Sequence, residues 1–235
     1  MILRLMGYED IEFDDQSNTL FVIKNHRLYS HVLFLLSSII YDKNKSTELL
    51  VIDNDKNITS DVLLITDPYG IDFNSKSILK EMYGLISKSI ISDEETNIKY
   101  QTLTDELSKL LDDELSEYNL EFDCKYDLTI DNYLKARSLK ITRSIDDRLY
   151  DRVIDYIELV TDLINKPVVV LFNCMDYFDD GELRELLKYK NYKHLHLLFV
   201  ENRDRTIHDI TIMLAKIAVN ICESFFVFFF ISIRF

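Results

Sequence analysis

Short runs of β-branched and leucine residues alternate with longer amphipathic stretches, and this alternation limits the fold classes open to the chain. Strands that alternate with helices predict an α/β fold, in which helices cover a sheet. The expected strands are Leu20–Lys24, Glu48–Ile52, Asp61–Thr66, Val168–Phe172 and Leu195–Val200. Between them, helices are expected at Leu28–Ile40 and Ser75–Ile90, the second with a cap at Asn74 or Ser75.

The strand signal stops between roughly residues 98 and 165, and long amphipathic stretches replace it. Apolar residues at three- and four-residue steps predict a helix from Leu103 to Tyr118. A second long helix is predicted up to Ile164, opening at a capping box formed by Ser144 and Asp147. Because the strand signal then resumes, we expect a helical section inserted into a discontinuous α/β core.

These signals predict where the domains begin and end. The α/β head is expected to comprise residues 1–95 and 166–209, and the α-helical domain residues 96–165. Residues 210–235 form an atypical apolar C-terminal tail that is rich in phenylalanine. Its apolar run Ser224–Ile233 has about half of the ~20 residues that a membrane-spanning helix needs. We therefore expect no membrane span, although the tail motivates a membrane-associated protein as one rival hypothesis.

Composition sets expectations for location and charge. The cysteines lie too far apart for a disulfide framework or a zinc site, which predicts a reducing, cytoplasmic chain, and no secretory leader is expected. The formal net charge of -14 argues against a nucleic-acid-binding protein, because affinity for phosphate comes from clustered Lys and Arg. That objection fails if the positive charge is segregated from the acids.

Enzymes of this fold class often carry a glycine-rich phosphate-binding loop that ends in lysine. No such loop is expected from the four glycines of the chain, Gly7, Gly70, Gly84 and Gly181, since none precedes a lysine. Asn173 follows the strand that would present a magnesium-binding acid, and we expect the later Asp176 to be a solvated loop residue. His194 and His196 are expected on one face at the start of a strand, as ordinary surface histidines.

Charge is segregated in the helical section. From Asp105 to Asp123 there are eight acidic residues and a single basic one, Lys109. From Lys135 to Arg143 there are four basic residues and no acid. Two interpretations stay open. Composition alone favours two solvated helix faces, whereas the sharper hypothesis assigns the acids to calcium and the bases to phosphate.

One segment, Asp61–Lys80 (DVLLITDPYGIDFNSKSILK), resembles the diagnostic segment of the Csn-two family of CRISPR-associated proteins. Further matches are Leu120–Asp123 (LEFD), Lys166–Asn173 (KPVVVLFN) and Leu197–Glu201 (LLFVE). They occur in the family's order and at about its spacing, and they cover the chain from its start to about Asp209. The combination is specific, whereas any single segment would be weak.

That resemblance implies a degenerate nucleotide-binding-like α/β head that lacks a phosphate loop, with an inserted, elongated α-helical domain. It implies a homotetrameric ring that binds the ends of double-stranded DNA on its basic inner surface, depends on calcium and has no catalytic activity. The implied role is antiviral defence by a type II-A CRISPR system, in which the ring supports acquisition of new spacers. The implied partners are the Cas integrase complex and the type II effector nuclease, with no membrane.

Site residues follow from the same resemblance. The expected calcium ligands, which match acidic positions of the family, are Glu121, Asp123 and Asp127. The expected DNA-binding residues are Lys135, Arg137, Lys140 and Arg143. The two lysines match basic positions that face the ring opening, and the two arginines are included because they share that segment. No catalytic residue is expected, and the rival hypothesis is a metal-dependent nuclease or NTPase that acts on DNA.

Overall fold

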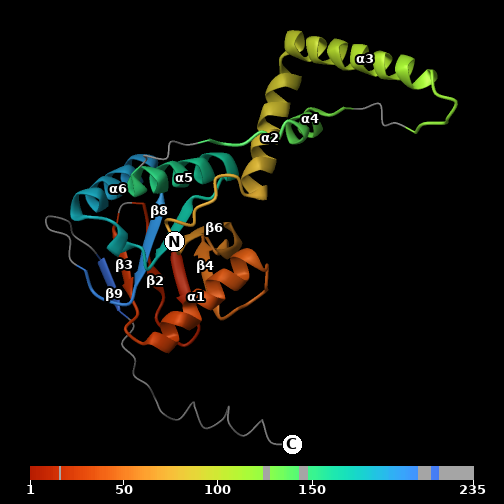
Figure 1. Cartoon of the computed structure of the whole chain (residues 1–235). Coiled ribbons are helices and arrows are strands. Elements are labelled where there is room, and N and C mark those ends of the chain that lie inside the picture. The colour runs from red at the N-terminus through yellow and green to blue at the C-terminus, as the bar shows by residue number, and fades with distance from the viewer. Residues whose placement is uncertain (16, 124–127, 143–147, 206–212, 217–235) are drawn as a thin grey trace, which may run out of the picture. The chain divides into compact units, whose positions relative to one another are not determined.

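The structure, a computed structural model, describes residues 1–15, 17–123, 128–142, 148–205 and 213–216. The chain divides into two compact units (Figure 1). The first unit comprises Met1–Ile71, Arg148–Ile157 and Lys166–Phe235, and the second comprises Asp72–Asp147 and Glu158–Asn165. The second unit is therefore inserted, in two segments, between parts of the first.

A five-stranded parallel sheet lies at the centre of the first unit. In spatial order its strands are β6 (Val62–Ile65), β7 (Val168–Phe172), β8 (His196–Glu201), β3 (Thr19–Val22) and β9 (Met213–Lys216). β6, β7 and β3 are buried along their whole length. Parallel strands that are covered on both faces have continuous apolar sequences, which explains why these runs do not alternate with polar residues.

Helices cover the two faces of this sheet (Figure 1). Alternate strand residues such as Phe21 and Val170 share one core with Val32 and Leu36 of α1 (His26–Tyr41). The intervening strand residues are also buried and point to the opposite face. α6 (Asp180–Lys193) and the first part of α5 (Leu149–Ile164) lie there and bury their own apolar residues, Tyr150, Val153, Ile157, Leu183, Leu186 and Leu187.

A second, antiparallel sheet extends the core beside α1. Its spatial order is β2 (Ile11–Glu12), β1 (Ile2–Leu5), β4 (Leu49–Asp53) and β5 (Lys56–Asn57). Leu3, Leu5, Leu49 and Val51 of β1 and β4 join the cluster that contains α1. Two short 3-10 helices, η1 (Thr59–Asp61) and η2 (Met175–Tyr177), complete the connections of the first unit.

The second unit is helical. It contains α2 (Lys76–Ser92), α3 (Glu94–Ser116), α4 (Ile130–Ala136) and the end of α5. Ser75 caps α2, since its hydroxyl accepts a hydrogen bond from the backbone N–H of Ile78 at 3.5 Å. α3 buries none of its residues in the single chain. Its leucines therefore form an exposed stripe rather than part of a core.

The α/β fold class is confirmed, and each strand and helix expected from the sequence is present. α3 begins at Glu94, well before the predicted start at Leu103, whereas the other described ends agree within a few residues. β1, β2, β5, β9, α4 and α6 were not predicted. The predicted capping pair of α5, Ser144 and Asp147, lies outside the described residues, as does the tail apart from β9.

Within the described ranges, no helix has both the length and the apolar character that a membrane span requires.

Candidate nucleic-acid interface

Three of the four predicted DNA-binding residues lie at the end of α4 and directly after it. Thr129 caps α4, because its hydroxyl accepts a hydrogen bond from the backbone N–H of Asn132 at 3.2 Å. Lys135 occupies the last turn, Arg137 is the C-terminal cap, and Lys140 follows three residues later. All three side chains are exposed, and the fourth residue, Arg143, lies outside the described residues.

The backbone at the end of α4 has a defined geometry. Ser138 adopts the left-handed conformation, with a φ of 51°. Its N–H donates to the carbonyl of Lys135 at 2.9 Å, and the N–H of Leu139 donates to the carbonyl of Leu134 at 3.2 Å. This pair of hydrogen bonds is the Schellman motif, which satisfies the last carbonyls of a helix and fixes the direction of the chain that leaves it.

The segment after this turn has no regular secondary structure and is held by side chains from the start of the unit. The Tyr83 hydroxyl of α2 donates to the carbonyl of Leu139 at 2.9 Å. The Asn74 side chain donates to the carbonyl of Ile141 at 3.1 Å and accepts from its N–H at 2.8 Å. The backbone is thus anchored on both sides of Lys140, while the Lys140 side chain itself is exposed.

This arrangement suits a polyanion. From Lys135 to Thr142 the chain carries three positive charges and no acidic side chain. The acidic residue of the first turn of α4, Asp131, accepts a hydrogen bond from the Ser87 hydroxyl. Lys and Arg side chains that no local acid neutralises are the groups that bind the phosphate backbone of nucleic acids.

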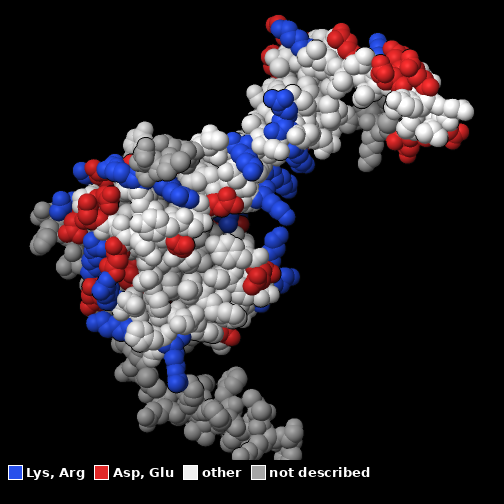
Figure 2. All heavy atoms as spheres, viewed as in Figure 1, with Lys and Arg blue, Asp and Glu red and all other residues white. Residues whose placement is uncertain are grey.

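Only two of the three predicted calcium ligands lie in the described part of the chain, so the structure does not test this metal site. Glu121 and Asp123 are exposed, in a segment after α3 that has no regular secondary structure, and Asp127 lies outside the described residues. Figure 2 shows acidic side chains gathered over the C-terminal part of α3. No group of three or more His, Cys, Asp or Glu side chains in the described part of the chain is arranged to hold a metal ion. Calcium binding therefore stays a prediction.

The carboxyl edge of the parallel sheet is where α/β proteins commonly bind ligands. In a phosphate-binding protein, a glycine-rich loop would follow a strand and lead into a helix. Here the connection from β3 to α1 is only Ile23, Lys24 and Asn25. The Asn25 side chain accepts from the N–H groups of Arg27 and Leu28, at 3.0 and 3.1 Å, and so occupies the helix N-terminus.

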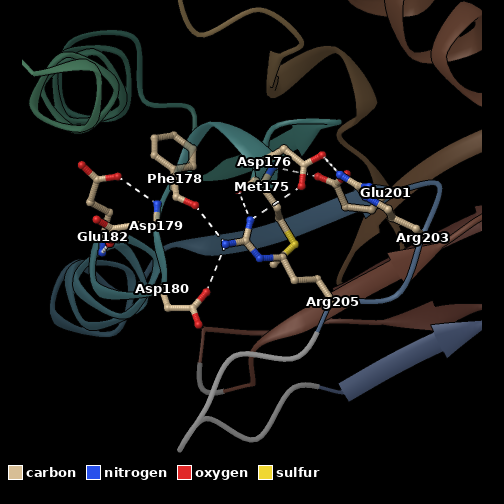
Figure 3. Close-up of polar contacts among 9 residues, drawn as sticks. All are labelled: Met175, Asp176, Phe178, Asp179, Asp180, Glu182, Glu201, Arg203 and Arg205. Atoms are coloured by element: carbon tan, nitrogen blue, oxygen red, sulfur yellow. Dashed lines mark hydrogen bonds and ion pairs between the residues drawn. The ribbon is translucent and has the colours of Figure 1, made fainter.

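Ion pairs fill the neighbouring part of this edge (Figure 3). The Asp176 carboxylate on η2 pairs with Arg203 and lies 3.8 Å from the guanidinium of Arg205. Arg205 also donates to the carbonyl of Phe178 at 3.0 Å and to the Asp180 carboxylate at 3.1 Å. The charge of Asp176 is therefore balanced by two arginines of the same chain.

A buried carboxylate, that of Glu201, is hydrogen-bonded to the backbone at this edge. The Glu201 carboxylate accepts from the N–H of Met175 at 2.9 Å, and burial raises the pKa of Glu201 (Figure 3). Burial also raises the pKa of the Cys174 thiol to about 12. A thiol with so high a pKa stays protonated at neutral pH and is a poor nucleophile. These groups fix the turn at η2 and supply no activated nucleophile.

The two histidines do not share one strand face, so that expectation was wrong. His194 is the C-terminal cap of α6, in the left-handed conformation with a φ of 53°, and only His196 lies in β8. The Nδ1 atom of His194 lies 2.9 Å from the Asp15 carboxylate. His196 is partly buried, and burial lowers its pKa.

Asn74 and Tyr83 also belong to the candidate interface, and neither was predicted to do so. Asn74 was considered only as a helix cap, a role that Ser75 fills. The adjacent pair Asn74-Ser75 could have indicated this role in the interface. One of the two residues suffices to cap the helix, so the other polar side chain can bind another partner.

Comparisons with known proteins agree with this fold. A family model described as CRISPR-associated protein (Cas_Csn2) matches residues 40–216. The CRISPR-associated protein Csn2 of Enterococcus faecalis is 24% identical over 187 residues, which are 79% of this chain and 83% of that protein. The CRISPR-associated protein Csn2 of Streptococcus agalactiae is 27% identical over 165 residues, 69% of this chain and 73% of that protein.

Among solved structures, the crystal structure of Stu0660 of Streptococcus thermophilus is similar, with a TM-score of 0.60. The match covers 92% of this chain and 74% of that one, and at 12% identity it concerns the fold alone. Since the family model spans well over half of the 235 residues, the chain belongs to the Csn2 (Csn-two) family of CRISPR-associated proteins.

Proposed function

We propose that this chain binds double-stranded DNA without turnover, as a ring of four copies that supports the acquisition of new spacers in a type II-A CRISPR system. Membership of a CRISPR-associated family gives the setting. The observation that carries the DNA-binding proposal is the exposed and anchored basic segment from Lys135 to Lys140.

The electrostatic objection to DNA binding is weaker at the level of this segment than for the whole chain. The net charge is -14, yet eight of the acids lie between Asp105 and Asp123, on α3 and the segment after it. The basic segment has no acid of its own. In a ring of four copies, the three described basic residues of each segment together supply twelve positive charges. A cleft lined by charges of one sign raises the local concentration of oppositely charged ligands and speeds their association.

Assembly of several copies is supported by α3. Leu103, Leu107, Leu110 and Leu111 follow the helical repeat and lie on one side of the helix, yet they are between 46% and 65% exposed. Four leucines on one side of a soluble helix favour a protein partner, because burying them stabilises a complex. We propose that the partner is another copy of this chain.

A role without turnover is supported by the carboxyl edge of the sheet. The connection from β3 to α1 has no glycine, and Asp176 is paired with arginines. No observation favours the nuclease or NTPase alternative. Work alongside the Cas integrase complex and the effector nuclease, and dependence on calcium, belong to the same proposal.

The test is the affinity for a linear duplex, measured by fluorescence anisotropy at several salt concentrations. Replacing Lys140 by Ala should weaken every duplex to about the same extent, because binding to phosphate carries no sequence information. It should also flatten the slope of log affinity against log salt by about 1 for each phosphate group that the variant complex no longer neutralises.

The matched control is Lys109→Ala, which removes the same charge from an exposed position in the acidic stretch of α3. Its affinity should stay within twofold of the wild type, because Lys109 lies outside the proposed DNA site. Unchanged affinity and salt slope in Lys140→Ala would remove the basic segment as the DNA site.

A further inference from the structure

The amide side chain of Asn74 makes two hydrogen bonds to a single residue, Ile141, that lies 67 positions later in the sequence. The side-chain NH₂ donates to the Ile141 carbonyl at 3.1 Å, and the side-chain oxygen accepts from the Ile141 N–H at 2.8 Å. Ile141 directly follows Lys140. Asn74 therefore fixes the backbone next to Lys140, the last lysine of the basic segment.

A second anchor acts on the other side of Lys140. The hydroxyl of Tyr83, which is 6% exposed, donates to the carbonyl of Leu139 at 2.9 Å. The turn at Ser138 fixes the start of the same segment, because the Leu139 N–H is bonded to the carbonyl of Leu134. The two neighbours of Lys140 are thus both held in place. Leu139 is bonded to α2 and α4, and Ile141 is bonded to Asn74.

The residue type matters at position 74. A primary amide is the side-chain group that offers a donor and an acceptor side by side, and both are used here. Asn74 is not needed as a helix cap, since the Ser75 side chain already accepts from the N–H of Ile78. An aspartate could accept from Ile141 but not donate to it, and an alanine could do neither.

An anchored backbone changes the cost of binding. A free segment must lose conformational entropy when it docks, and this loss weakens binding. A segment that is fixed before binding avoids that loss, so the same lysine binds phosphate more tightly. The exposed Lys140 side chain on a fixed backbone combines access to the ligand with a defined position.

We propose that Asn74, assisted by Tyr83, is a positioning residue for phosphate binding by Lys140. The inference rests on the proposed function, because it assumes that Lys140 contacts the phosphate backbone of duplex DNA. It assigns a role in DNA binding to an uncharged side chain that does not itself touch the ligand.

The test is a double-mutant cycle on the full chain, with a linear duplex as the probe and anisotropy as the readout. Asn74→Ala should lower the affinity by at least threefold and flatten the salt slope in the same direction as Lys140→Ala. In the Lys140→Ala background, Asn74→Ala should change the affinity by less than twofold. Amide hydrogen exchange at Ile141 should become faster, while the amides of α2 stay protected.

Two further variants keep the test decisive. Tyr83→Phe removes only the hydroxyl, and it should weaken binding less than Asn74→Ala and only when Lys140 is present. Asn132→Ala changes an exposed asparagine of α4 and should leave the affinity within twofold of the wild type.

The outcomes separate this inference from the proposed function. If Lys140→Ala weakens binding but Asn74→Ala and Tyr83→Phe do not, the positioning role is overturned and the DNA site stands. If Asn74→Ala has the same effect with and without Lys140, its role is general and the inference fails. If Lys140→Ala has no effect, the basic segment is not the DNA site and the inference fails with it.

Discussion

The leucine stripe of α3 predicts how strongly copies of the chain associate. The size of the effect can be calculated from the exposed fraction of each leucine. Leu107 is 46% exposed and Leu110 is 58% exposed in the single chain, and both belong to the stripe. Replacing both by Asp places two charges on the surface that we propose is covered by another copy. The double variant should therefore assemble less well than the wild type.

The expected loss follows from the area that remains to be buried. Full burial of a leucine side chain contributes about 1.5–3 kcal/mol, so burying the exposed half contributes about 1 kcal/mol. If the same stripe from two copies meets across a two-fold axis, each residue counts twice. The two substitutions then cost about 4 kcal/mol, which is roughly a thousandfold in the dissociation constant.

Analytical ultracentrifugation over a wide range of protein concentrations measures this loss. The wild type should sediment as a tetramer, and the Leu107→Asp, Leu110→Asp variant as smaller species at the same concentrations. Leu85→Asp on α2 is the control, because Leu85 is 52% exposed and lies on another helix. Identical sedimentation of the wild type and the double variant, with helix content unchanged by circular dichroism, would refute the role of α3.

Three further predictions concern metal, pH and turnover. Chelation of calcium, or Asp123→Ala, should lower both the DNA affinity and the melting temperature. Magnesium should not restore them, since it demands tighter octahedral geometry. Unchanged affinity and melting temperature would show that these acids are only a solvated surface. Because burial raises the pKa of Glu201 in the folded state, its contribution to stability is present below pH 4.5 and is lost as pH rises. In the Glu201→Gln variant, the denaturant midpoint should therefore fall less steeply as pH rises above 4.5. An unchanged dependence of the midpoint on pH would contradict burial as the cause of the pKa shift. Purified protein should hydrolyse neither ATP nor GTP, whereas turnover above a buffer control that Asp176→Ala abolishes would support the enzyme alternative.

Four of the five strands of the central sheet could be predicted because they are largely apolar. β6, β7 and β3 are buried on both faces, so their runs of Val, Leu and Ile stand out from the polar sequence around them. β2 and β5 have two residues each, too few for any periodic signal. These two strands of the antiparallel sheet were therefore missed, whereas β4 was predicted.

α6 was missed for a different reason. Its apolar residues Leu183, Leu186 and Leu187 are few, and the buried residue that continues their face is Lys190. The Lys190 amine donates a hydrogen bond to the carbonyl of Ser17 at 2.6 Å, and no local sequence pattern predicts this contact. The capping box of Asp179 and Glu182 was the usable signal, because an acid three residues after a capping side chain marks the start of a helix.

The candidate site was only partly accessible from the sequence. The basic residues stand out as one segment without acids, but only the family resemblance assigned them to DNA. Their anchoring by Asn74 could not be predicted, because residues 74 and 141 are joined only by the fold of the helical unit. The left-handed conformation of His194 likewise depends on how α6 ends, and it moved that residue out of the strand.

The central claim is that this protein binds duplex DNA by encircling it, with the basic segment lining the ring. The most direct measurement compares the affinity for a linear duplex with that for a closed circle of the same sequence and length, at one salt concentration. A ring that threads DNA from its end should bind the linear form far more tightly, and Lys140→Ala should weaken that binding. Equal affinity for the linear and circular forms would contradict encirclement, and unchanged affinity of Lys140→Ala for the linear form would contradict the basic segment as the binding site.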